Sequence, residues 1–98
     1  MAYKLIWSPA LREDLHGIVS FIARDSRSRA EAFGFRLMRE TNKLQQFPEI
    51  GRVVPEFGDP GIREIVVRAY RIIYRVNDGL KLVEVGRVWH GARGAPSL

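Results

Sequence analysis

The sequence contains no cysteine and no long apolar run, and each absence excludes a class of protein. Without cysteine there is no disulfide framework. No stretch approaches the roughly 20 apolar residues that a membrane-spanning helix needs. The apolar run near the N-terminus is too short for a signal peptide. We therefore expect a soluble, cytoplasmic protein.

Motifs for metals, cofactors and nucleophiles are also missing. His16 and His90 lie far apart, and there is no His-Glu-x-x-His spacing, phosphate-binding glycine loop or Gly-x-Ser-x-Gly elbow. The adjacent acids Glu13 and Asp14 stand at a predicted helix start, where we expect them to complement the helix dipole. The sequence predicts no metal and no cofactor.

Lysine is scarce, whereas arginine is abundant. Thirteen of the 16 basic residues are arginine, and the net charge is +5 with an isoelectric point near 10.2. Residues 61–98 hold seven cations and three anions, so the positive charge gathers in the C-terminal third. Because arginine binds phosphates and carboxylates with a planar fork, this pattern predicts nucleic acid or an acidic protein as partner.

The chain length of 98 residues predicts one domain, spanning residues 1–98. A short strand is expected at Tyr3–Trp7, and Ser8-Pro9 then has the residues of a helix start. The first helix carries an apolar stripe with helical spacing. That stripe consists of Leu11, Leu15, Ile18, Val19 and Ile22.

A second helix is predicted from Ser28 to Gln46. Ser28 and Glu31 have the spacing of a capping box, and Pro48 prevents the helix from continuing. Two helices with matching apolar stripes form a helical hairpin that needs a flat surface to cover it.

The rest of the chain predicts a loop and then strands. Glu49–Gly61 is rich in glycine and proline, and strands follow at Ile62–Arg68, Tyr70–Val76 and Leu80–His90, with a turn at Asn77-Asp78-Gly79. The predicted fold class is α+β with the order βααβββ, in which the hairpin packs on one face of an antiparallel sheet and leaves the other face open.

Alternation along the strands predicts which side chains share a face. Arg71, Ile73 and Arg75 share one face of their strand. In the last strand both alternating sets contain a charge, so alternation alone does not decide which set faces the helices.

One group of residues in the basic C-terminal third could carry chemistry, namely Glu64, Arg71, Arg75, His90 and Arg93. Histidine and arginine are suited to phosphodiester cleavage without a metal. A base, an acid and fixed cations suffice when the 2′-hydroxyl is the nucleophile. The alternative is that His90 is an ordinary strand-end histidine and that Arg71 and Arg75 form a solvated sheet face.

The sequence resembles the RelE/ParE toxin superfamily in five ordered segments. These are Trp7-Ser8-Pro9-Ala10-Leu11-x-x-Asp14-Leu15-x-x-Ile18, Phe47–Arg52, Ile62-Arg63-Glu64, Tyr70–Val76 and Val85–Arg93. The resemblance implies the toxin of a type II toxin–antitoxin system, linked to growth inhibition and plasmid stabilisation and neutralised by a cognate antitoxin. It implies a binding surface made of Arg63, Glu64, Arg71, Arg75, Arg87 and Arg93.

The resemblance implies two alternative mechanisms, and different residues of the chain favour each of them. ParE-like members inhibit DNA gyrase, and the Pro-x-x-Gly-Arg stretch after the hairpin is similar to theirs. RelE-like members cleave messenger RNA on the ribosome, and Arg71 matches an arginine of theirs, which would make Arg71, His90 and Arg93 catalytic. No tyrosine follows His90 and no lysine cluster precedes Ile62, so gyrase inhibition is preferred. A non-toxic binding module of the same fold is the third alternative.

Overall fold

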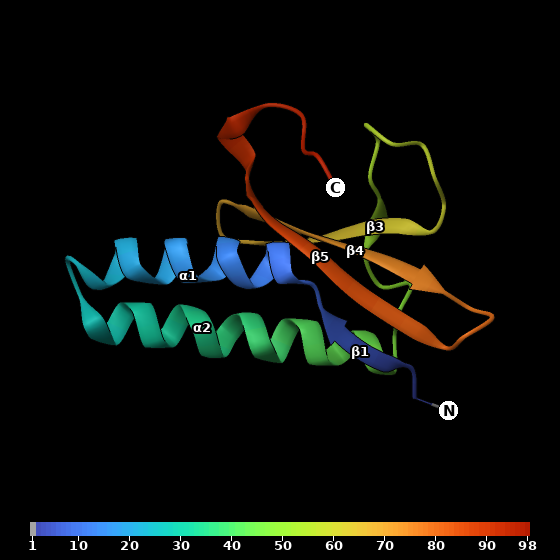
Figure 1. The fold of residues 1–98 in the computed structure, drawn as a ribbon, viewed down its shortest axis with the longest axis horizontal. Helices are drawn as coiled ribbons and strands as arrows, with labels where there is room; N and C mark the ends of the chain where they lie inside the picture. Colours follow the sequence, from blue (N-terminus) through green and yellow to red (C-terminus); the bar gives the residue numbers. More distant parts are fainter. Residues whose placement is uncertain (1) are drawn as a thin grey trace.

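The computed structural model describes residues 2–98 as a helical hairpin packed on a five-stranded sheet (Figure 1). The α+β class is confirmed. The elements are β1 (Lys4–Trp7), α1 (Pro9–Ala23), α2 (Arg27–Asn42), the 3₁₀ turn η1 (Lys43–Gln45), β2 (Arg52–Val53), β3 (Ile62–Val67), β4 (Tyr70–Asn77), β5 (Leu82–His90) and the 3₁₀ turn η2 (Gly91–Arg93).

The sheet is mixed, not wholly antiparallel as the sequence predicted. Its strand order is β1-β5-β4-β3-β2, and β3, β4 and β5 form the expected antiparallel meander, but β1 pairs in parallel with β5. The hairpin explains this direction. Because α2 returns the chain to the end of the sheet at which β1 starts, β3 starts at the same end. The strand β5 runs in the same direction as β3, and therefore parallel to β1 (Figure 1).

A serine side chain caps the N-terminus of each helix. The cap of α1 is the expected residue, whereas the cap of α2 is not. Ser8 Oγ accepts a hydrogen bond from the amide of Leu11 at 3.0 Å, as the Ser8-Pro9 pattern predicted. For α2 the cap is Ser26, whose Oγ accepts from the amide of Arg29 at 3.2 Å, and not Ser28. The turn after α1 is so short that Ser26 already stands at the start of α2.

The main core lies between the hairpin and the sheet, and a second cluster lies on the far face. The main core contains Leu11, Phe33, Leu37, Leu44, Val67, Ile72, Tyr74, Val83, Val85 and Val88. The far cluster contains Val54, Ile62, Ile73 and Trp89, with Phe57 packed against it. The far face is therefore not open, because the segment between β2 and β3, seen in yellow-green in Figure 1, covers part of it.

A bulge in β5 decides the facing of the last strand. Ile73 pairs with Arg87 and Tyr74 pairs with Val85, so Gly86 is an extra residue. The extra residue shifts the alternation by one position. Val83 and Val85 before the bulge and Val88 after it all reach the main core, which explains why strict alternation found a charge in both sets.

Tyr74 ties the segment after the hairpin to the sheet. Its buried hydroxyl donates to the carbonyl of Pro48 at 2.8 Å and accepts from the amide of Gly51 at 3.0 Å. Burial raises the pKa of Tyr74. A Cβ on Gly51 would lie 2.4 Å from the carbonyl oxygen of Glu64 and 2.6 Å from the Tyr74 hydroxyl, so only glycine fits. The Pro-x-x-Gly stretch is thus an anchor.

We expect Tyr74→Phe to lower the free energy of unfolding by about 1–3 kcal/mol, because the Pro48 carbonyl and the Gly51 amide lose a buried partner. Tyr3→Phe is the control, since the Tyr3 hydroxyl bonds Asp78 at the exposed surface. Its effect should stay within about 0.5 kcal/mol. Urea unfolding measures both, and equal effects would contradict the anchoring role.

Candidate functional site

Glu64 is a buried carboxylate at the centre of an ion-pair network on the far face. The residue is 1% exposed, and both carboxylate oxygens are bound. Oε1 accepts from Arg71 Nε and Oε2 accepts from Arg52 Nε, each at 2.6 Å. The β2–β3 register places Arg52 opposite Glu64. Arg71 and Glu64, both expected to bind a partner, are therefore bound to each other.

Arg71 is also held by a second carboxylate. The carboxylate of Glu56, in the segment between β2 and β3, accepts hydrogen bonds from both terminal nitrogens of Arg71, at 2.7 and 2.8 Å. The hydrogen bond from Arg71 lowers the pKa of Glu56 to about 2, and these carboxylates raise the pKa of Arg71. The Arg71 side chain is 13% exposed, so little of it remains for a ligand.

Asp14 binds the bulge of β5. Its carboxylate accepts from Arg87 Nε and Nη2 at 2.7 and 3.0 Å and from the amide of Val88 at 3.1 Å. The expectation that Asp14 complements the helix dipole is therefore wrong, because its carboxylate connects α1 to β5. The pair raises the pKa of Arg87, first through the hydrogen bond to Asp14.

His90 and Arg71 lie on opposite faces of the sheet. The His90 ring contacts the edge of Tyr70, with centroids 5.1 Å apart, and Tyr70 in turn packs on Phe33 of α2. His90 Nδ1 accepts from the amide of Ala92 at 3.0 Å and so caps η2. Arg71 faces the other way, with Glu64. The structure does not bring together the predicted catalytic trio.

Arg93 shares a cavity with His90 and stacks on the far-face tryptophan. It borders the same hollow as His90 and Tyr70. Its guanidinium also lies 4.1 Å from the centroid of the Trp89 ring, a cation–π contact. Arg93 is exposed, and it forms no ion pair with any residue from 2 to 98.

The other predicted binding arginines have different surroundings. Arg63 donates to the carbonyl of Gly51 at 2.9 Å and so strengthens the anchor at Tyr74. Arg75 is exposed on β4 opposite Glu84, and within the described part of the chain no carboxylate lies within 4.0 Å of it. Of the predicted cations, Arg75 and Arg93 are therefore the ones left open to a partner.

Two apolar hollows mark surfaces that the sequence did not indicate. A groove of about 240 Å³ along the two helices is lined by Trp7, Leu15, Val19, Ala30, Glu31, Gly34, Phe35 and Met38. We refer to these residues as the hairpin groove. Phe35 and Met38 are 61% and 47% exposed. They lie beside the buried stripe of α2, which is why helical spacing did not select them.

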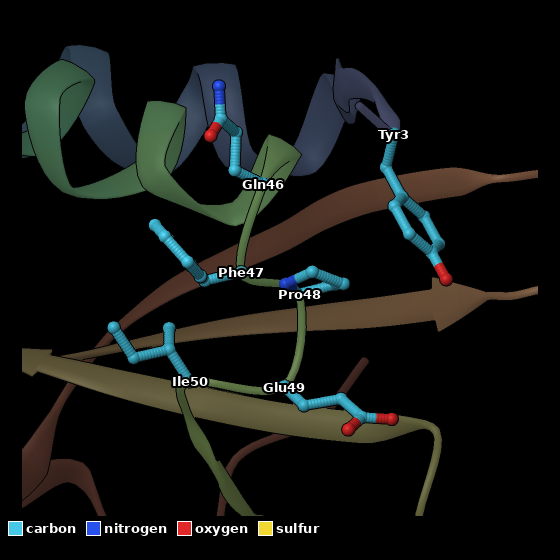
Figure 2. Close-up of a pocket in the computed structure, with 6 residues that line it drawn as sticks. All are labelled: Tyr3, Gln46, Phe47, Pro48, Glu49 and Ile50. Atoms are coloured by element: carbon cyan, nitrogen blue, oxygen red, sulfur yellow. The ribbon is translucent and has the colours of Figure 1, made fainter. Parts of the chain in front are cut away.

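The second hollow, of about 510 Å³, lies beside the link from η1 to β2 (Figure 2). Phe47 and Ile50 are each more than half exposed there. Figure 2 shows the Tyr3 ring on the other side of Pro48 from Phe47.

Residues 2–98 offer neither a metal site nor a membrane-spanning helix. No group of three or more histidine, aspartate or glutamate side chains could hold a metal ion. Neither helix combines the length and the apolarity that crossing a membrane requires.

Comparison with known families decides the assignment. The family model of the ParE toxin of type II toxin–antitoxin systems, from the parDE pair, matches residues 5–94. The chain belongs to the ParE toxin family. The match confirms the RelE/ParE resemblance and makes the protein a toxin of a type II toxin–antitoxin system. Among curated proteins, none matches the sequence significantly.

Solved structures share the fold of this ParE-family toxin. The chromosomal ParDE system of P. aeruginosa superimposes with a TM-score of 0.73 at 20% identity, over 91% of this chain and 96% of that one. A mutant of the E. coli toxin RelE in the free state gives 0.67 at 21% identity, covering 96% and 88%. The toxin–antitoxin complex RelBE2 from Mycobacterium tuberculosis gives 0.63 at 20%, covering 92% and 99%.

The Glu56–Arg71 pair predicts a pH dependence of the toxin's stability. The pKa of Glu56 is lowered from an ordinary value of 4.5 to about 2 on folding, so the folded state binds fewer protons between these values. The pair's contribution is complete above pH 4.5 and is lost as the pH falls towards 2. Glu56→Gln should therefore flatten the rise of stability with pH in this window.

Urea unfolding at several pH values between about 2 and 5 tests this expectation. Glu31→Gln is the matched control, because Glu31 forms no ion pair within residues 2–98. An unchanged slope in Glu56→Gln would show that the pair does not contribute.

Proposed function

We propose that this ParE-family toxin arrests growth in the cytoplasm by binding and inhibiting DNA gyrase, and that a cognate antitoxin neutralises it. The observation that carries the proposal is the separation of Arg71 from His90. Arg71 is bound by Glu56 and Glu64 on the far face, whereas His90 packs on Tyr70 on the face towards the helices.

This arrangement disfavours cleavage of a phosphodiester by the trio. A general acid or base and a stabilising cation must both lie within hydrogen-bond reach of the reacting group. Side chains on opposite faces of a sheet do not meet that condition. In addition, the guanidiniums of Arg52 and Arg71 are matched by the carboxylates of Glu56 and Glu64, so this network has no net positive charge that would attract a phosphate. Inhibition by binding requires neither a general acid nor a free Arg71.

The hairpin groove supports the second half of the proposal, neutralisation by an antitoxin. We infer that an amphipathic helix of the antitoxin occupies this groove. Such a helix lays an apolar face into a groove of this kind. Arg12 and Arg39 lie one helical turn from Leu15 and Phe35, so acidic residues of the partner that lie opposite these arginines, and away from Glu31, would meet opposite charge. The E. coli RelE mutant has been solved with a peptide of its antitoxin, RelB.

Gly34 is a further reason to assign a partner to the groove. Glycine weakens the middle of a helix, yet a Cβ at this position would meet no atom within 4 Å. The fold of the toxin alone therefore does not require glycine here. A partner side chain seated against the bare backbone of α2 would require it.

The purified toxin should inhibit supercoiling by gyrase and leave ribosome-bound messenger RNA intact. His90→Gln should keep its inhibition within about twofold, whereas a nuclease would lose about 100-fold or more in rate with its general acid or base. The supercoiling assay and a cleavage assay on translating ribosomes are run on the same preparations, with folding checked by circular dichroism.

Cut messenger RNA with unaffected gyrase would replace the proposal by the RelE-like mechanism. Full growth on expression of the folded chain without antitoxin would replace it by a non-toxic binding module.

Gly34→Ala should stabilise the free toxin and weaken its complex with the antitoxin. The free energy of unfolding should rise by about 0.5–1 kcal/mol, because alanine favours the helix. The dissociation rate of the antitoxin should rise by about 10-fold or more, since the methyl group fills the space assigned to the partner.

Gly17→Ala is the matched control. A Cβ on Gly17 also meets no atom within 4 Å, but Gly17 lies outside the hairpin groove. It should give the same gain in stability and no change in antitoxin dissociation. Equal dissociation rates for the two variants would exclude the hairpin groove as the antitoxin site.

A further inference from the structure

Two adjoining cavities open where the tip of the helical hairpin meets the turn between β3 and β4. Their volumes are about 290 and 360 Å³, and Tyr70 and His90 line both. Arg29 and Arg68 border the first cavity, and Arg93 borders the second. We call these five residues and the space between them the hairpin-tip cleft. It lies on the helix side of the sheet, away from the network around Arg71, although the Arg93 guanidinium also contacts the ring of Trp89 on the far face.

The arginines of the hairpin-tip cleft differ from Arg52, Arg71 and Arg87 because they form no ion pair. Arg52, Arg71 and Arg87 are each bound by a carboxylate. Within residues 2–98, Arg29, Arg68 and Arg93 have no carboxylate within 4.0 Å.

The carboxylates that line the cleft do not cancel this charge. They are Asp25 in the first cavity and Glu13 and Asp14 in the second. Arg87 already neutralises Asp14. In the first cavity Arg29 and Arg68 face one carboxylate, that of Asp25, so this part of the cleft favours an anion.

The backbone at Arg68 is unfavourable for an arginine. Its φ is +56°, in the left-handed region that glycine adopts readily and that other side chains avoid. It is the first residue of a two-residue turn, where glycine is the usual choice. The fold alone would be served better by glycine, and strained residues of this kind gather at ligand sites. The arginine supplies a cation at the mouth of the cleft.

The aromatic pair of the cleft adds neutral donors. Because His90 Nδ1 accepts from the amide of Ala92, the neutral ring carries its proton on Nε2, which is left to donate. The Tyr70 hydroxyl forms no hydrogen bond to any of the described residues. Guanidinium groups with neutral N–H and O–H donors are the set that binds phosphate oxygens.

We propose that the hairpin-tip cleft binds a phosphate monoester. The phosphate would lie between Arg29 and Arg68, and the apolar surface of Ile22 and Phe33 beside them suits an organic group attached to it. The proposal does not depend on which target the toxin acts on, because the cleft and the far-face network are separate.

Titration of the purified chain with adenosine monophosphate and with inorganic phosphate, followed by calorimetry, tests the site. Arg68→Gly should weaken binding of either probe by about 10-fold or more, since a charge-assisted hydrogen bond is lost. It should not harm folding, because glycine suits the backbone there. Arg29→Gln, which leaves that turn unchanged, should weaken binding comparably.

Lys81→Gly is the matched control. Lys81 also has a left-handed backbone, with φ +51°, and its loss removes the same charge, but it lies in the turn between β4 and β5. It should leave binding within about twofold. Tighter binding of the nucleotide than of inorganic phosphate would support a monoester ligand, and equal binding would overturn the assignment of an organic group to the cleft. Absence of saturable binding, or equal losses in Arg68→Gly and Lys81→Gly, would overturn the proposal.

Discussion

The burial of the Glu64 carboxylate is the constraint around which the far face is built. A charge removed from water must be matched by opposite charge and by hydrogen bonds, and removal of one partner from such a pair costs about 3–5 kcal/mol. Arg52 and Arg71 each donate a hydrogen bond to one oxygen of the Glu64 carboxylate. The first arginine holds the short edge strand β2 in register, and the second draws the Glu56 segment over the sheet. The ion pairs and the second apolar cluster therefore stabilise the same loop.

This constraint determines which basic side chains of the toxin remain available to a partner. A sequence with a net charge of +5 suggests a basic binding face on the sheet. In the folded chain, Arg71 and Arg87 of that region bind carboxylates of their own protein, and Arg63 binds the carbonyl of Gly51. The cations that remain open include those at the hairpin tip, those beside the hairpin groove and Arg75. Electrostatic attraction of partners is thus directed to the helical side and to the ends of the sheet.

Much of the fold could be predicted from local patterns, whereas the candidate site could not. The helices follow from apolar spacing and from Ser8-Pro9, and the meander follows from β-branched residues and a turn sequence. The parallel pairing of β1 and the strand β2 depend on residues distant in the chain. The bulge at Gly86 breaks the alternation on which face assignment relies. Arg87 and Asp14 are 73 positions apart, and nothing in the segment around Glu56 indicates Arg71 as its partner.

The pairing of β1 with β5 has a consequence for the order in which the chain folds. The register joins Lys4 to Leu82, so the first strand has no neighbour in the sheet until the last one exists. During synthesis the two helices can associate early through contacts close in sequence, but the sheet closes only when β5 has left the ribosome. A nascent toxin therefore presents its hairpin before its sheet is complete. Any molecule that recognises the helices alone has a kinetic advantage over one that needs the finished fold.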